Sequence, residues 1–103
     1  MSDPIKFTDL HQSALPYLPA ILQRILPGGK IVGRGWNQVT STNDPTAHAE
    51  MVAIRDACRR LKTFVLEGCD LYTSCEPCPM CLSAIYWARL KHVYYGNTRK
   101  DAQ

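Results

Sequence analysis

The 103-residue sequence contains no apolar run long enough to cross a membrane. A spanning helix needs about 20 mostly apolar residues. The most apolar early stretch, 14–26, is too short and is interrupted by Pro16, Pro19, Gln23 and Arg24. A secretory signal is not visible either. We therefore expect a cytoplasmic protein with reduced thiols and no membrane partner.

A strong excess of one charge is also missing. The formal net charge is +3, with 20% charged and 46% hydrophobic residues. This composition argues against long disordered tails and gives only a weak electrostatic reason to expect a nucleic acid partner. There are no internal repeats or low-complexity tracts. Length and composition predict a single domain over residues 1–103.

The five cysteines do not form a disulfide framework, because their number is odd and three of them are closely spaced. In a reducing compartment, Cys75, Cys78 and Cys81 indicate metal binding or catalysis. An iron–sulfur run would need a fourth cysteine at position 85, where the chain has Ile85. A structural zinc site with Cys75 or Cys69 as a fourth ligand is an alternative reading.

The order of predicted elements indicates an α/β fold. Pro27-Gly28-Gly29 predicts a turn between two antiparallel strands, although the first strand could also be a helical turn. The later strand–helix–strand–helix–strand order predicts parallel strands with helices packed on the sheet. The expected elements are a helix at 8–15, strands at 20–26 and 30–36, a loop at 37–46, a helix at 47–62, a strand at 71–74, a helix at 78–89 and a strand at 92–96.

The burial pattern of the helices is read from their apolar residues. In the first long helix, capped by Asp44 or Thr46, the inward stripe is expected to be Met51, Ile54, Cys58 and Leu61. In the second, it is expected to be Leu82 and Ile85 with Trp87 or Ala88. Trp36 and Trp87 are expected in the core more than at a substrate.

His48, Cys78 and Cys81 are candidate ligands of one zinc ion. Cys78 and Cys81 are three residues apart at a helix start, which places both sulfurs on one face and should lower the thiol pKa values. His48 begins the other helix. If the two helices lie side by side, three ligands converge and leave the fourth position open for water, as in catalytic zinc sites.

Glu50 and Asn37 complete the candidate site. Glu50 follows His48 by two residues and can accept and deliver protons beside a water molecule that zinc activates. The pattern His-x-Glu followed by Pro-Cys-x-x-Cys is that of zinc nucleobase deaminases. Asn37, at a strand end, is either a turn former or a side-chain amide that reads the edge of a base.

Over residues 35–102 the sequence resembles the cytidine deaminase-like superfamily, and within it bacterial guanine deaminases. The likeness rests on Gly35-Trp36-Asn37 and on the runs 43–50, 71–81 and 84–89. It implies a three-layer α/β/α fold with a five-stranded mixed sheet, and a homodimer with one Zn²⁺ per chain. By this resemblance His48, Cys78 and Cys81 bind zinc, Glu50 carries protons and Asn37 binds a small-molecule purine. The implied reaction converts guanine to xanthine and ammonia.

The sequence departs from the family in two respects, so other functions remain as alternatives. Residues 15–29 do not match the stretch that opens the family's first strand, and the sequence stops at Gln103, before further family helices that cover the base and exchange between subunits. We therefore expect a fold that is incomplete at both ends. The alternatives are deamination of tRNA adenosine or cytosine, and a zinc-binding subunit without turnover.

Overall fold

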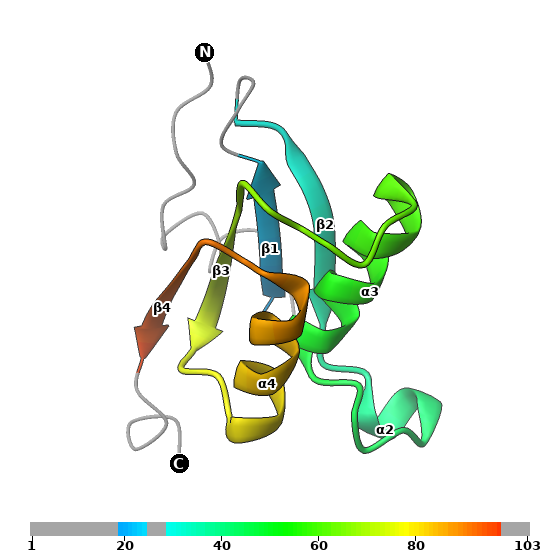
Figure 1. Cartoon of the computed structure of the whole chain (residues 1–103). Coiled ribbons are helices and arrows are strands. Elements are labelled where there is room, and N and C mark those ends of the chain that lie inside the picture. Colours follow the sequence, from blue (N-terminus) through cyan, green and yellow to red (C-terminus); the bar gives the residue numbers. More distant parts are fainter. Residues whose placement is uncertain (1–18, 25–28, 98–103) are drawn as a thin grey trace.

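The computed structural model describes residues 19–24 and 29–97, which form a mixed four-stranded sheet with helices (Figure 1). The strand order is β2-β1-β3-β4; β1 is antiparallel to both β2 and β3, while β3 and β4 are parallel. This confirms the α/β class and the parallel later strands. The elements are β1 (Pro19–Arg24), β2 (Ile31–Trp36), α2 (Val39–Thr42), α3 (Ala49–Leu61), β3 (Cys69–Cys75), α4 (Pro79–Ala88) and β4 (His92–Asn97).

The β1–β2 hairpin is confirmed, and the alternative of a helical turn in place of β1 is wrong. Ala20 pairs with Gly35, and the register shifts between Leu22 and Gln23. The buried Gln23 side chain donates a hydrogen bond from Nε2 to the carbonyl of Gly29 at 2.6 Å. This bond links β1 to the residues just before β2. The expected helix at 8–15 and residues 25–28 lie outside the described residues.

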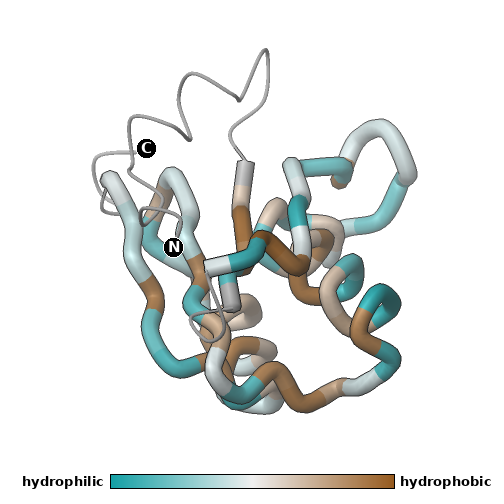
Figure 2. Tube along the Cα trace, turned by 90° about the horizontal axis from the view of Figure 1, so that it is seen from above, coloured by the Kyte–Doolittle hydropathy of each residue, from teal (hydrophilic) through white to brown (hydrophobic). Residues whose placement is uncertain are grey.

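Helices α3 and α4 pack on the same face of the sheet (Figure 1). One apolar core joins both helices to alternate residues of the strands, among them Leu22 and Leu71, which are fully buried. Figure 2 shows the hydrophobic stretch of β1 (brown) in the middle of the molecule. On the opposite face, Ile21 and Tyr72 form a smaller buried pair against Ile31. The core therefore fixes both helices against the central strands.

Small residues bring α3 unusually close to β2. A Cβ atom added to Gly35 would lie 2.5 Å from the carbonyl oxygen of Ala49, and one added to Gly33 would lie 2.7 Å from that of Ala53. Ala53 and Ala57 are fully buried on this face of α3. The expected stripe is therefore only partly correct: Ile54 is buried, whereas Met51, Cys58 and Leu61 are half-buried.

The inward face of α4 is narrower than expected. Cys81, Ile85 and Ala88 are buried, but Leu82 is 50% exposed and Trp87 is 72% exposed. Trp36 is also 46% exposed. The expectation that these three large side chains belong to the core is wrong; in α4, the buried positions are 81, 85 and 88, and Ala84 packs beside them against the core. No helix among the described residues is long and apolar enough to cross a membrane.

The segment expected as a loop at 37–46 contains a short helix, α2. The Asn37 side chain accepts a hydrogen bond from the Val39 amide at 2.9 Å, and Thr42 donates its hydroxyl to the Gln38 carbonyl at 2.7 Å. The helix ends at Asn43 with φ of 54°. Local side-chain hydrogen bonds thus stabilise one turn of helix that the polar composition did not predict.

Candidate metal centre and active site

His48 is held in place by the turn that precedes α3. The Asp44 carboxylate accepts hydrogen bonds from the Thr46 amide at 2.9 Å and from its hydroxyl at 2.6 Å, and these bonds lower the pKa of Asp44. The Thr46 carbonyl then accepts the His48 amide at 2.9 Å. Neither Asp44 nor Thr46 caps the helix, contrary to expectation; His48 itself is the N-cap residue, with an extended backbone. Its ring is therefore presented at the helix start.

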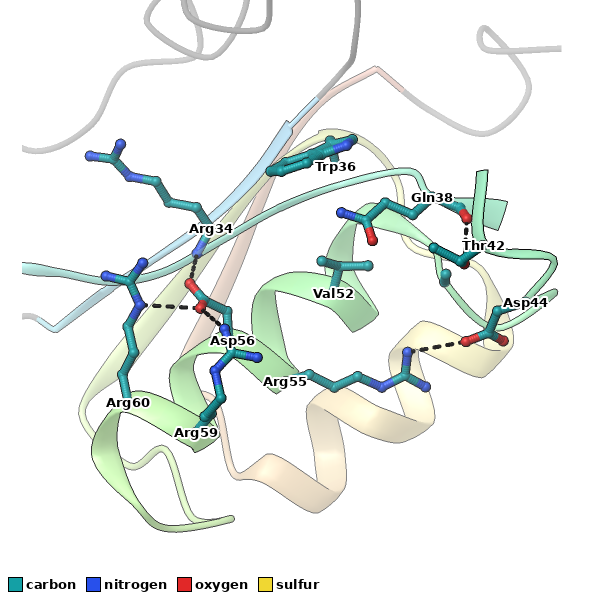
Figure 3. A pocket seen from close by; sticks show the side chains of 11 residues that line it. Arg34, Trp36, Gln38, Thr42, Asp44, Val52, Arg55, Asp56, Arg59 and Arg60 are labelled. Carbon is teal, nitrogen blue, oxygen red and sulfur yellow. Dashed lines mark hydrogen bonds and ion pairs between the residues drawn. The ribbon is translucent and has the colours of Figure 1, made fainter. Parts of the chain in front are cut away.

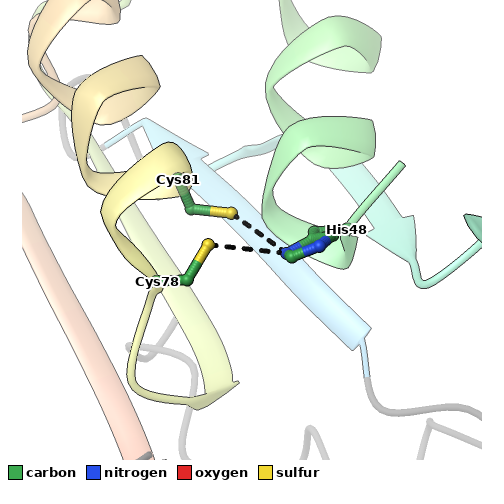
Figure 4. A group of neighbouring side chains, drawn as sticks. All are labelled: His48, Cys78 and Cys81. Atoms are coloured by element: carbon green, nitrogen blue, oxygen red, sulfur yellow. Dashed lines mark hydrogen bonds between the residues drawn. The ribbon is translucent and has the colours of Figure 1, made fainter. Parts of the chain in front are cut away.

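Cys78 and Cys81 are presented in the same way by α4. Cys78 is the N-cap residue, Pro79 follows at the first helical position, and the Cys78 carbonyl accepts the Leu82 amide at 2.9 Å. Cys81 is buried one turn into the helix. Figure 4 shows both sulfur atoms directed at the ring of His48 across the gap between the two helix N-termini.

The distances within this group are those of a tetrahedral zinc site. Nδ1 of His48 lies 3.6 Å from Sγ of Cys78 and 3.7 Å from Sγ of Cys81. Zn–S bonds of about 2.3 Å and Zn–N bonds of about 2.0 Å at the tetrahedral angle separate nitrogen and sulfur by about 3.6 Å. All three ligand atoms lie within 4.8 Å of one another. The side chains therefore need little movement to hold the ion.

Within residues 19–24 and 29–97, the potential metal-binding group around His48 contains three members. Cys69 is fully buried in the core, and Cys75 is not part of the group. The alternative of a structural zinc site with Cys75 or Cys69 as a fourth ligand therefore finds no support among the described residues. Three protein ligands leave one tetrahedral position for water or substrate, the arrangement typical of catalytic zinc.

Glu50 lies in the first turn of α3 and is 9% exposed. Burial, followed by the nearby Glu50 carboxylate, raises the pKa of the Cys81 thiol. This direction is opposite to the expected lowering of the thiol pKa by the helix N-terminus, because burial disfavours the charged thiolate. Cys81 becomes a thiolate when a cation replaces its proton, so metal binding here releases a proton.

Asn37 follows the last residue of β2 and does not belong to the ligand group. Its side chain is exposed, and its Oδ1 atom starts helix α2. The adjacent Gln38 amide donates to the Ala47 carbonyl at 2.8 Å, which joins the end of β2 to the residue before His48. Sequence reasoning missed this link and the Gly33–Gly35 contact with α3; two glycines two residues apart in a strand were the available signal.

The family model described as the cytidine and deoxycytidylate deaminase zinc-binding region matches residues 23–97. The chain belongs to this family. Zinc is therefore the metal that the His48–Cys78–Cys81 group is suited to bind, and the donor set and distances agree with it.

Two deaminases of other organisms are similar to this chain over most of its length. Guanine deaminase of Bacillus subtilis (strain 168) is 59% identical over 78 residues, or 76% of this chain and 50% of that protein. The tRNA-specific adenosine deaminase of Aquifex aeolicus (strain VF5) is 49% identical over 76 residues, or 74% of this chain and 50% of that protein. The X-ray structure of the Bacillus subtilis guanine deaminase superposes with a TM-score of 0.75 at 55% identity, covering 82% of this chain and 52% of the other. This chain thus spans about half the length of these relatives.

Proposed function

We propose that this deaminase-family chain carries the zinc site of a guanine deaminase, which converts guanine and water to xanthine and ammonia. The observation that carries the proposal is the group of three ligands at zinc-binding distances, beside a buried Glu50, in a chain 59% identical to a guanine deaminase over 78 residues. A small-molecule purine is the corresponding substrate.

His48, Cys78 and Cys81 would hold the ion, and the helix starts that carry them fix its position. When bound, zinc supplies a Lewis acid that makes water nucleophilic near neutral pH. Glu50 would accept the proton that water loses and deliver it to the purine ring nitrogen. It would then accept the proton of the new hydroxyl group and deliver it to the departing amine. Each acceptance is followed by a delivery, so the carboxylate returns to its starting form after each pair of transfers and one residue can serve the whole cycle.

Asn37 is proposed to orient the purine. Its carbonyl oxygen accepts the Val39 amide, which holds the side chain in one rotamer and leaves the Nδ2 hydrogens to donate to an acceptor on the base. The backbone hydrogen bond from Gln38 to Ala47 joins the residue after Asn37 to the residue before His48.

Adenosine in tRNA is the second candidate substrate. The 49% identity to the Aquifex aeolicus tRNA-specific adenosine deaminase favours it, and the same ligand group would serve an extruded base. Ammonia release by the zinc-loaded protein should be measured with guanine, adenine, cytosine and tRNA. We expect guanine to react fastest. Preferential reaction with tRNA or cytosine would replace the proposed substrate, and no release from any of them would favour a zinc-binding protein without turnover.

A homodimer in the cytoplasm completes the proposal. Helix α4 exposes Leu82, Tyr86 and Trp87 by 50%, 79% and 72%, a concentration of apolar surface that a second copy of the chain would cover. The cysteine ligands need to stay reduced to bind metal, which a cytoplasmic location provides.

A further inference from the structure

A second recessed site lies on the outer side of α3, beside the edge strand β2 (Figure 3). Its volume is about 550 Å³, within the range of small-ligand pockets. His48, Glu50, Cys78 and Cys81 do not line it; Ala47, next to His48, does. The pocket is therefore separate from the zinc site and can have its own ligand.

The pocket concentrates positive charge. Arg34, Arg55, Arg59 and Arg60 line it together with two carboxylates, Asp44 and Asp56, so its lining carries a net charge of +2. The whole chain has a formal net charge of only +3. Such an excess in a recess, where the protein excludes part of the solvent, favours an anionic ligand.

Asp56 gathers two of these arginines. Its carboxylate is buried and accepts the Arg34 backbone amide at 3.0 Å. One of its oxygens also accepts Arg59 at 2.6 Å and Arg60 at 3.1 Å. The arginine side chains remain 76% and 59% exposed. Because a guanidinium has five N–H donors, both can donate to a ligand while Asp56 holds them in place.

A flat apolar surface lies beside these cations. Trp36 is two residues after Arg34 on β2, so both side chains leave the strand on the same side. The indole is 46% exposed and lines the pocket. Figure 3 shows the Arg34 guanidinium extending away from Asp56, while the Arg55 guanidinium lies on Asp44, 3.6 Å away. Arg34 and Trp36 thus line one pocket from the same strand.

We propose that this pocket binds a nucleotide, with its phosphate on Arg34, Arg59 and Arg60 and its base against Trp36. Guanidinium groups match phosphate oxygens in pairs, and an exposed indole stacks on any base. An acidic peptide would use the arginines but would leave the indole unused. The nucleotide is either free or part of a single strand, and the two sources share this chemistry.

The test uses the zinc-loaded 103-residue chain and two probes without an exocyclic amine, uridine 5′-monophosphate and a labelled uridine octamer. Because neither probe can be deaminated, the result does not depend on the proposed reaction. We expect binding of at least one probe. If the arginines neutralise two phosphates of the octamer, raising the salt concentration from about 50 to 200 mM should weaken octamer binding by about seven-fold. If the octamer binds tightly and uridine 5′-monophosphate does not compete with it, the ligand is a single strand. If the two probes bind equally well, the ligand is a free nucleotide.

Two variants localise the binding. R59Q/R60Q should weaken it by about ten-fold and reduce the salt dependence, and W36L should weaken it by about five-fold with little change in the salt dependence. R89Q/K91Q removes the same charge from exposed positions outside the pocket and should change binding less than two-fold. Thermal melting confirms that each variant folds. Absence of binding by both probes, or equal losses in R59Q/R60Q and R89Q/K91Q, would overturn the proposal.

Discussion

Cysteine residues of this chain differ sharply in their surroundings. Cys78 and Cys81 point at one imidazole, whereas Cys58 is half-buried against the core of α3. We predict that Cys78→Ala or Cys81→Ala lowers bound zinc from about one per chain to a small fraction, because two ligands hold zinc poorly. Elemental analysis after dialysis measures it.

Cys58→Ala is the matched control for this prediction. It removes a thiol of the same chain outside the ligand group, so zinc content should stay at about one per chain. Equal zinc loss in all three variants, or iron in place of zinc in the unaltered protein, would mean that the ligand assignment is wrong.

Glu50 is predicted to act on protons and not as a metal ligand. Glu50→Gln keeps the shape of the side chain but removes its ability to accept a proton. Zinc content should therefore be retained, while turnover of the deaminated base falls by about 10²–10⁴-fold. Activity and zinc content are measured on the same preparation. Zinc loss in parallel with activity would make Glu50 a ligand or a support for one.

At the scale of single residues, the spacing predicted which three candidate ligands lie together, but it did not predict their environment. His48 lies at the start of α3, and Cys78 and Cys81 lie at the start of α4. The three residues therefore come together if the two helices lie side by side, an arrangement that the order of elements predicts. The raised pKa of the Cys81 thiol comes first from burial and then from Glu50, and no local sequence pattern encodes either. The roles of Glu50 and Asn37 stay predictions.

The contact between β2 and α3 is the element-scale feature most sensitive to a single methyl group. We predict that Gly35→Ala lowers the free energy of unfolding by about 2–3 kcal/mol, because the added Cβ would lie 2.5 Å from the Ala49 carbonyl oxygen and meet other backbone atoms. Thermal or urea unfolding measures the change. Since Ala49 follows His48, zinc affinity should fall as well.

Gly68→Ala provides the comparison for Gly35→Ala. Its φ of 78° makes alanine unfavourable, but a Cβ atom there would meet no atom within 4 Å. We expect Gly68→Ala to lower the free energy of unfolding by about 1 kcal/mol and to leave the zinc affinity unchanged. A loss at Gly35 no larger than at Gly68 would show that the β2–α3 contact can relax.

Element boundaries were predictable where periodicity and turn residues agreed, as for the hairpin, α3 and α4. They were not predictable for α2, which has four residues and depends on hydrogen bonds from Asn37 and Thr42. The direction of large side chains also escaped prediction. Leu82 and Trp87 are apolar at positions compatible with a helical stripe, but the close packing of α4 uses Cys81, Ile85 and Ala88.

At the scale of the whole molecule, helix α3 takes part in two separate sites, the zinc-ligand group and the cationic pocket. The inner side of the α3 start carries Glu50 beside the cysteines, while its outer side carries Arg55, Asp56, Arg59 and Arg60. Asp56 joins this outer side to the Arg34 amide of β2. The same strand–helix contact therefore positions the zinc ligands and the cationic pocket, so damage to it should affect both.

The exposed apolar face of α4 leads to a prediction about assembly. Leu82 and Tyr86 are one helical turn apart, and Trp87 adjoins them, with most of the Tyr86 and Trp87 surfaces exposed. If a second copy covers this face, the double variant Y86S/W87S should shift the protein from dimer to monomer at micromolar concentration, since the loss of two buried aromatic anchors weakens an interface by a hundred-fold or more, on the order of 3–6 kcal/mol. Sedimentation equilibrium measures the change.

Phe64→Ser is the matched control, because Phe64 is equally apolar and 73% exposed but lies on the loop after α3. It should leave the dimer intact. Zinc content should be unchanged in both proteins, since none of the three altered side chains belongs to the ligand group. A monomeric unaltered protein would show that α4 does not mediate self-association, and a dimer that survives Y86S/W87S would place the interface on another surface. Only the loss of association in Y86S/W87S, with Phe64→Ser unaffected, assigns the dimer to α4.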